Sequence, residues 1–289
     1  MSPPIAESPL SIAQCANLAL TWEVTALKPG NVHRGADFDD LVFPDFLTVA
    51  ALTAPIYDAA PSRPIGDTVL DAVRKARQAC ETNVNLGSAL LLAPLAATPR
   101  GEPLADGVRR LLDRLTPDDS RKVYEAIRLA QPGGLGAAAE HDVAGPAPDD
   151  LLVAMRAAAD RDLVAAQYAN GFADVLGVVA PAIAAALAGG LRLNDAIVWT
   201  SVQLMSRWPD SLIARKCGVE IARSAQARAA KALALGPPGN DAYYDALGDL
   251  DFWLRSAGRR RNPGTTADLV AAGLFALLRD GIIKAPYRW

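Results

Sequence analysis

Apolar residues recur at helical spacing along almost the whole chain, and this pattern limits the fold more than any other feature. The alternation of apolar and polar residues between paired turns that is typical of strands is absent. Alanine and leucine are abundant, while aromatic residues make up only 6% of the sequence, a balance that favours helices over strands. We therefore predict an all-α fold, a single-domain bundle of about a dozen helices over residues 1–289.

Capping residues and apolar stripes locate the helices. The expected helices run from Ser8 to the Lys28-Pro-Gly turn and over residues 43–60, 67–80, 85–97, 149–160, 163–170, 172–188, 194–208, 241–256 and 266–280, with another opening at Thr116. The apolar stretch from Val175 to Leu191 is too short and too weakly hydrophobic for a membrane span, so we predict a buried central helix there.

Charge and cysteine content narrow the classes of partner. The net charge is −3, and no basic cluster with interleaved aromatic residues indicates a nucleic-acid surface. The three cysteines are widely spaced, which favours a reducing compartment, and no signal peptide is evident, so we expect a cytoplasmic protein. The sequence leaves the oligomeric state open, with a homodimer as one alternative.

The turn after the first helix is the most informative segment. Proline and glycine after Lys28 form a tight turn that is expected to hold Lys28 and Arg34 as a cradle for polyphosphate. Glu23 and His33 lie beside it and could bind metal or move protons. The alternative is a helix C-terminus with cations favoured by the helix dipole.

Acidic residues follow directly. Asp39 and Asp40 could share Mg²⁺, which prefers oxygen ligands and often bridges to substrate phosphates. The alternative is an ordinary acidic loop.

Polar residues crowd the start of the apolar helix at 86–95. Thr82, Asn83 and Asn85 could bind ribose or phosphate, because a helix N-terminus offers free N–H groups to an anion. The alternative is plain capping by Asn85.

Three later segments, 131–142, 161–218 and 259–268, also combine turn residues with charged side chains. A glycine-rich run, 131–136, precedes His141 and Asp142, which could perform acid–base or metal chemistry, or could belong to a surface loop. Asp162 and Asp210 are the favoured metal ligands, with Asp39, Asp40 and Asp142 as alternates.

Cationic residues accompany two of these segments. Arg215 and Lys216 follow Asp210 over two helical turns, with surface ion pairs as the alternative. Residues 259–268 place three arginines before a turn containing Gly264 and Thr265, with Asp268 in the next helix, and a solvated basic run is the alternative. Turns at helix ends that carry such residues suit a polyanionic nucleotide.

Together these segments resemble the triphosphoribosyl-dephospho-CoA synthase family. The matching segments occur in the family's order over nearly the whole chain: Glu23 with Lys28-Pro-Gly30, Asp39-Asp40 with Phe46, 133–136 with Asp142-Val143, Arg161-Asp162 with Tyr168 and Gly171-Phe172, 210–218, and 263–269.

The resemblance implies an all-helical enzyme that transfers the triphosphoribosyl group of ATP to 3′-dephospho-CoA and uses Mg²⁺. The acceptor's ribose 2′-hydroxyl attacks C1′ of ATP's ribose and adenine leaves, a glycosyl transfer for which a pair of carboxylates is suited. The implied site residues are Lys28, Arg215 and Lys216 for the phosphates, and Asp142, Asp162, Asp210 and Asp268 as acids; His33 joins Asp142, Asp210 and Asp268 as a candidate catalytic group.

The chain departs from the citrate-lyase members in two places. It has Asn83-Val-Asn85-Leu-Gly87 where they carry His-Lys-Gly, and Asn31-Val-His33-Arg34 where they carry an acidic residue. Both features resemble a branch in archaea and in bacteria with methanopterin-linked one-carbon pathways, and they leave open a related acceptor. Two other functions remain as alternatives: a helical Mg²⁺-dependent hydrolase of a nucleotide or ADP-ribose-type substrate, and a non-catalytic nucleotide-binding protein.

Overall fold

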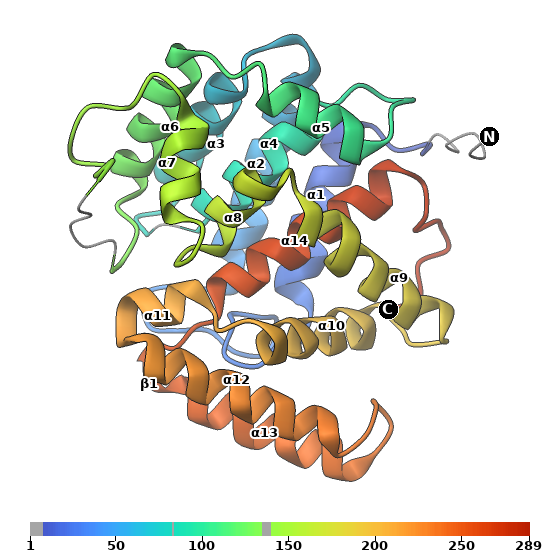
Figure 1. Ribbon diagram of the computed structural model, residues 1–289. Helices are drawn as coiled ribbons and strands as arrows, with labels where there is room; N and C mark the ends of the chain where they lie inside the picture. Colours follow the sequence, from blue (N-terminus) through green and yellow to red (C-terminus); the bar gives the residue numbers. More distant parts are fainter. Residues whose placement is uncertain (1–7, 83, 135–139) are drawn as a thin grey trace.

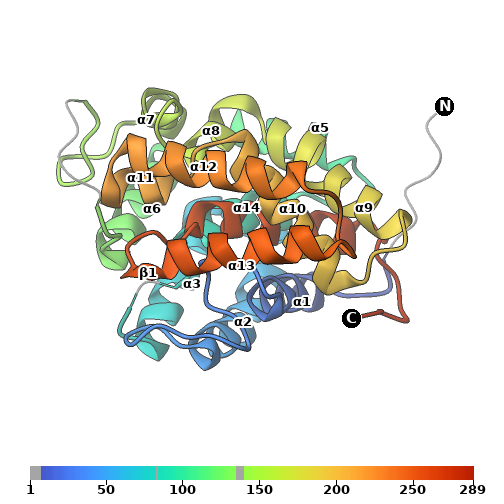
Figure 2. The ribbon, with the colours of Figure 1, turned by 90° about the horizontal axis from the view of Figure 1, so that it is seen from below.

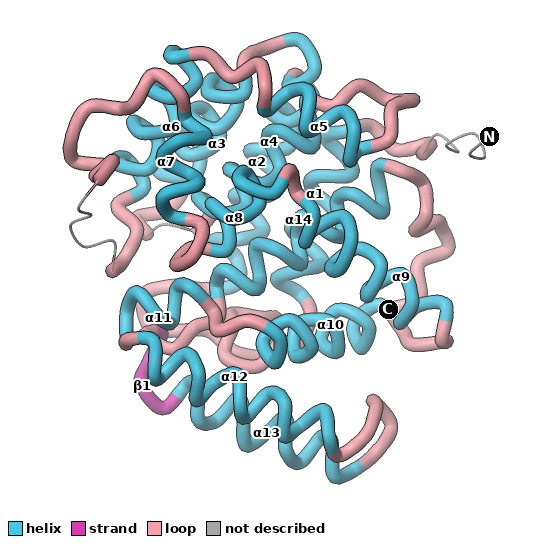
Figure 3. The backbone as a smooth tube through the Cα atoms, in the orientation of Figure 1, coloured by secondary structure: helices cyan, strands magenta, loops and turns pink. Residues whose placement is uncertain are grey.

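The computed structural model describes residues 8–82, 84–134 and 140–289. Within them the chain forms fourteen α-helices and one four-residue strand, which confirms the predicted all-α fold (Figures 1 and 3). The helices are α1 (Ile12–Thr25), α2 (Phe43–Asp58), α3 (Ile65–Ala79), α4 (Leu86–Ala97), α5 (Leu104–Leu112), α6 (Pro117–Ala130), α7 (Leu151–Ala158), α8 (Leu163–Asn170), α9 (Ala180–Ala188), α10 (Leu193–Arg207), α11 (Ser211–Cys217), α12 (Val219–Ala234), α13 (Asp241–Arg255) and α14 (Gly264–Arg279). A 3-10 turn (Ala60–Ser62), a π-helical turn (Val175–Val179) and β1 (Ser256–Arg259) complete the description.

One helix boundary and one helix that was not predicted show how local sequence acts. The N-cap of α1 is Ser11 instead of the predicted Ser8, because the Ser11 hydroxyl accepts from the Gln14 N–H and the Gln14 side chain accepts from the Ser11 N–H. α12 was not predicted as a helix. The residues that it buries are alanines, which give a weak periodic signal.

The central helix is α14, not the predicted segment from Val175 to Leu191. α14 runs through the middle of the molecule and buries nearly all its residues, whereas α9 buries only Ala180 and Ile183 (Figure 1). α9 is rich in alanine, which offers little apolar area to drive burial. Among the described helices, no single one is long and apolar enough to cross a membrane; the pair Leu163–Asn170 and Val175–Ala188 meets that test together but is bent by 97°.

Two apolar clusters share α10. Ile197 and Leu204 belong to the main core with α1, α4 and α14, while Val202 and Met205 pack with α11, α12 and α13. The hairpin of α12 and α13 therefore lies across α10, as Figure 2 shows from below.

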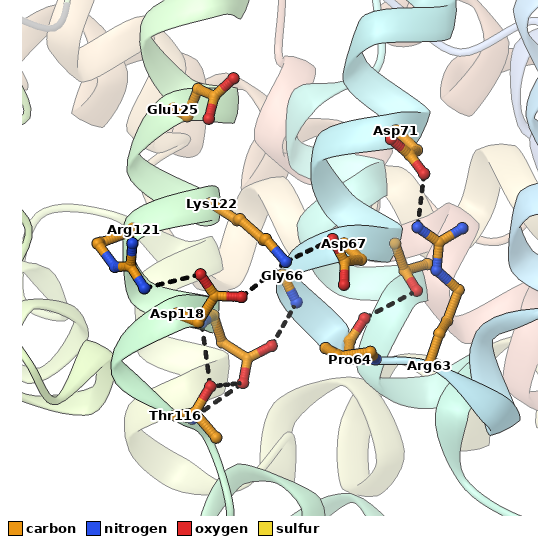
Figure 4. Close-up of polar contacts among 12 residues, drawn as sticks. Arg63, Pro64, Gly66, Asp67, Asp71, Thr116, Asp118, Arg121, Lys122 and Glu125 are labelled. Atoms are coloured by element: carbon orange, nitrogen blue, oxygen red, sulfur yellow. Dashed lines mark hydrogen bonds and ion pairs between the residues drawn. The ribbon is translucent and has the colours of Figure 1, made fainter.

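The contact between α3 and α6 positions one side of the site described below. Lys122 on α6 lies 2.6 Å from Asp67 and 2.7 Å from Asp118, and the Gly66 N–H donates to the Asp119 carboxylate at 2.7 Å (Figure 4). A Cβ on Gly66 would lie 2.6 Å from the Asp119 Cα, so the helices can approach this closely only at glycine.

Candidate active site

A cavity of about 600 Å³ lies where the five singled-out segments meet. Each segment contributes to its lining, through Glu23, Thr82, Asp142, Arg215 and Asp268 among others. Segments far apart in sequence therefore meet at one cavity, although Lys28 and Asp210 are not part of its lining. The remaining wall is apolar and comes mainly from α1, α2, α4, α7 and α8.

The N-termini of two long helices open onto this cavity. Gly87 and Ser88 in the first turn of α4 line it, as do Gly264 and Thr265 at the start of α14. Thr265 is buried, and its hydroxyl accepts a 3.0 Å hydrogen bond from the Ser211 hydroxyl. The positive ends of both helix dipoles therefore favour an anion in the cavity.

Cationic side chains from α11 and the segment before α14 form one wall. Arg215, Lys216, Arg259 and Arg260 all line the cavity. Burial lowers the pKa of Lys216, and the positive charges of Arg259 and Arg215 lower it further. A polyanion bound at this wall would relieve the repulsion among these cations.

Asp268 is a cavity-lining carboxyl group whose pKa is raised by the fold. It accepts a 2.6 Å hydrogen bond from the Ser88 hydroxyl and abuts Gly87, whose added Cβ would lie 1.9 Å from Asp268 Oδ2. Burial raises the pKa of Asp268 to about 7, and the hydrogen bond from Ser88 opposes this while Glu23 and other nearby carboxylates add to it. Asp268 therefore holds a proton in a large share of molecules near neutral pH.

Asp210 does not line the cavity, in contrast to the predicted catalytic and metal-binding roles. It is 2% exposed; its Oδ1 accepts from the N–H groups of Leu212 and Ile213, and its Oδ2 accepts from the N–H and hydroxyl of Thr266, at 2.8–3.0 Å. Burial raises the pKa of Asp210. These four bonds join the N-termini of α11 and α14, so Asp210 positions the two helices.

Lys28 does not present an exposed ammonium, so that part of the prediction is wrong. Its side chain is fully buried, and its Nζ lies 2.8 Å from Glu23 Oε1 and also donates to the Glu23 carbonyl. The tight turn sends the ammonium back under the last turn of α1. Glu23, not Lys28, lines the cavity.

His33 and Arg34 also lie outside the cavity lining. The His33 Nδ1 accepts from the Gly35 N–H at 3.1 Å, and burial together with Arg255 and Lys28 lowers the pKa of His33 to about 4. Arg34 lies over the Trp289 ring, 5.9 Å from its centroid. The predicted turn is present, but the side chains of His33 and Arg34 do not reach the cavity lining.

Of the predicted metal ligands, Asp142 and Asp162 line the main cavity, whereas Asp210, Asp39 and Asp40 do not. Asp39 and Asp40 line a separate hollow, where Asp40 lies 2.7 Å from Arg259. Asp162 lines the main cavity, caps α8 through Oδ1 and pairs with Arg215 through Oδ2. In the described part of the chain, no group of three or more histidine, cysteine or acidic side chains could hold a metal ion.

Most of the other predicted site residues belong to the cavity lining. Thr82, Asn85, Asp142, Lys216 and Gly264 all line the cavity, and Asn83 lies outside the described residues. Asp142 is held in its loop by the Ala144 N–H, which donates to its Oδ1 at 2.8 Å.

Several lining residues were not predicted. Arg77 and Tyr124 come from the end of α3 and the middle of α6, and Ser88 from the first turn of α4, where no recognisable motif marks them. Asn262 lies within the segment 259–268, but its position gave no signal of its own.

The chain is similar to known proteins both in sequence and in fold. Residues 9–285 match the model of the family described as ATP:dephospho-CoA triphosphoribosyl transferase. A crystal structure from Archaeoglobus fulgidus, provisionally assigned as a triphosphoribosyl-dephospho-CoA synthase, is similar with a TM-score of 0.63 and 27% identity, covering 81% of this chain and 99% of that chain. No functionally curated protein matches the chain.

Proposed function

The chain belongs to the ATP:dephospho-CoA triphosphoribosyl transferase family, and we propose that the cavity is where the triphosphoribosyl group passes from ATP to the acceptor. The family's reaction, catalysed by a transferase, joins ATP to 3′-dephospho-CoA and releases adenine. The observation that carries the proposal is that one cavity combines a cationic wall, two helix N-termini and a buried carboxyl group, Asp268, whose pKa is raised to about 7.

The triphosphate is best accommodated at the cationic wall. Arg215 and Lys216 supply charge-assisted hydrogen bonds, each typically about 1.5–3 kcal/mol. Arg259 and Arg260 extend this wall and could bind a second phosphate-bearing molecule, which suits an acceptor that itself carries a diphosphate.

Asp268 is the group best suited to protonate the departing adenine. Loss of a neutral purine requires a proton on the ring, and an acid whose pKa lies near the working pH transfers it most efficiently. Asp268 meets that requirement, and Ser88 fixes the orientation of its carboxyl group.

Mg²⁺ is proposed to enter with the triphosphate. Mg²⁺ is commonly held by one or two carboxylates plus substrate phosphates, and Asp142 and Asp162 are acids of the lining near the cationic residues. This fits the absence of a ligand cluster among the described side chains, because the phosphates would supply most of the oxygens. The ion would neutralise phosphate charge.

The test is to incubate the protein with ATP, Mg²⁺ and 3′-dephospho-CoA and to measure adenine and the triphosphoribosylated acceptor by mass spectrometry. We expect adenine only when the acceptor is present. Adenine released equally without acceptor would indicate the hydrolase, and no ATP binding by calorimetry would indicate loss of the chemistry; either would contradict the proposal.

A further inference from the structure

The buried pair of Glu23 and Lys28 lies at the edge of the same cavity. Lys28 has no exposed surface, while Glu23 is 8% exposed and contributes to the lining. The ammonium binds Glu23 Oε1 at 2.8 Å and also the Glu23 carbonyl oxygen. Lys28 thus fixes the end of a side chain that lines the cavity.

The turn that places Lys28 is itself fixed by a distant helix. The Gly30 N–H donates to Asp251 on α13 at 2.7 Å, and Gly30 has a φ of +75°, which only glycine adopts readily. A Cβ at Gly30 would lie 2.7 Å from the Leu254 side chain. The close contact with α13 therefore keeps the ammonium directed back toward Glu23.

The two charges require each other. A buried ammonium without a negative partner is strongly unfavourable, so the Glu23 side chain compensates the charge of Lys28. In the described part of the chain, Lys28 is the ion-pair partner of Glu23 and occupies one carboxylate oxygen. Glu23 also lines the cavity close to Asp268, a buried carboxyl group whose pKa burial raises to about 7.

Two carboxyl groups in different protonation states are what glycosyl transfer needs, one as acid and one as base. Two other acids are already engaged: the buried Asp210 accepts four hydrogen bonds, and the half-buried Asp162 caps α8 and pairs with Arg215.

We infer that Glu23 is the general base that activates the acceptor hydroxyl, and that Lys28 is a positioning residue that holds the Glu23 carboxylate in place. This inference rests on the proposed function. The 2′-oxygen of the acceptor forms a bond to C1′ as the bond from C1′ to the adenine nitrogen breaks. The hydroxyl proton passes to Glu23, and a proton passes from Asp268 to the leaving adenine. Exchange with solvent afterwards restores both groups.

The experiment compares the turnover number for adenine release, the ATP affinity and the melting temperature of E23Q, E23A, K28M and E23Q/K28M. E125Q is the matched control, because Glu125 is an exposed acid paired with Arg74 outside the cavity. We expect E23Q to lose about a hundredfold to ten-thousandfold in turnover with ATP affinity within about threefold of wild type. Formate should partly restore E23A, because a small carboxylate can replace the missing base.

Lys28 is tested by its dependence on Glu23. K28M should lower turnover in the wild-type background and have no further effect in the E23Q background, since a positioning residue acts only through its partner. If K28M does not fold, E23Q and formate rescue of E23A still decide the role of Glu23.

Three results would overturn the inference. One is an E23Q variant with at least a third of wild-type turnover, and another is an equal loss from K28M in both backgrounds. A third is a covalent ribosyl adduct on Glu23, which would make it a nucleophile. A wild-type protein that releases no adenine would instead overturn the proposed function, so the two failures are distinguishable.

Discussion

Replacing Lys28 by methionine tests the buried ion pair most directly. The side chain of Lys28 is fully buried and Glu23 is nearly so, and methionine is close to lysine in length but carries no charge. Breaking a buried pair by removing one partner typically costs about 3–5 kcal/mol, because the other charge is left without compensation. For a domain of this size that corresponds to a fall in melting temperature of roughly 6–15 °C.

The assay is chemical and thermal denaturation of four proteins: wild type, K28M, E23Q/K28M and R74M. Arg74 is the matched control, because it pairs with Glu125 at 2.6 Å but both side chains are about half exposed, and such pairs are worth about 0–1 kcal/mol. The double variant should recover most of the loss, since removing both charges leaves no unpaired ion. A loss below about 1 kcal/mol in K28M, similar to that of R74M, would refute the reasoning.

Four further predictions follow from the cavity. Folding raises the pKa of Asp268 to about 7, so between about pH 4 and 7 the folded state binds a proton that the unfolded state has released. The free energy of unfolding should therefore fall by up to about 1.4 kcal/mol per pH unit as pH rises from 4 to 7. D268N should abolish this fall in denaturation curves. G87A should displace the Asp268 carboxyl group and lower adenine release more than tenfold with little change in melting temperature, whereas unchanged turnover would contradict the contact. R215A should weaken ATP binding by about tenfold to a hundredfold in calorimetry, and R34A, outside the cavity, should leave it unchanged. ATP affinity should fall when EDTA replaces Mg²⁺, and equal affinity would argue against a metal-bound triphosphate.

The sequence by itself determined the class of fold and the segments that form the site. Helical periodicity and capping residues are local properties, so α8 was predicted with its observed bounds and α2 to within two residues. Turns rich in Gly, Asn and Asp mark helix ends, and helix ends are where backbone N–H groups remain available for ligands. Thr82, Asp142, Lys216 and Asp268 were found in this way.

The tertiary structure decided which side chain of each segment faces the cavity. Lys28 and Glu23 lie in one motif, yet only contact of the turn with α13 sends the ammonium inward and leaves the carboxylate at the lining. The sequence favoured Asp210 as a metal ligand. In the structure α11 packs against α14, and both carboxylate oxygens of Asp210 accept hydrogen bonds from the N-termini of these two helices. The proton on Asp268 depends on burial and on charges brought from α1, more than 240 residues away in sequence, and no local pattern records such distances.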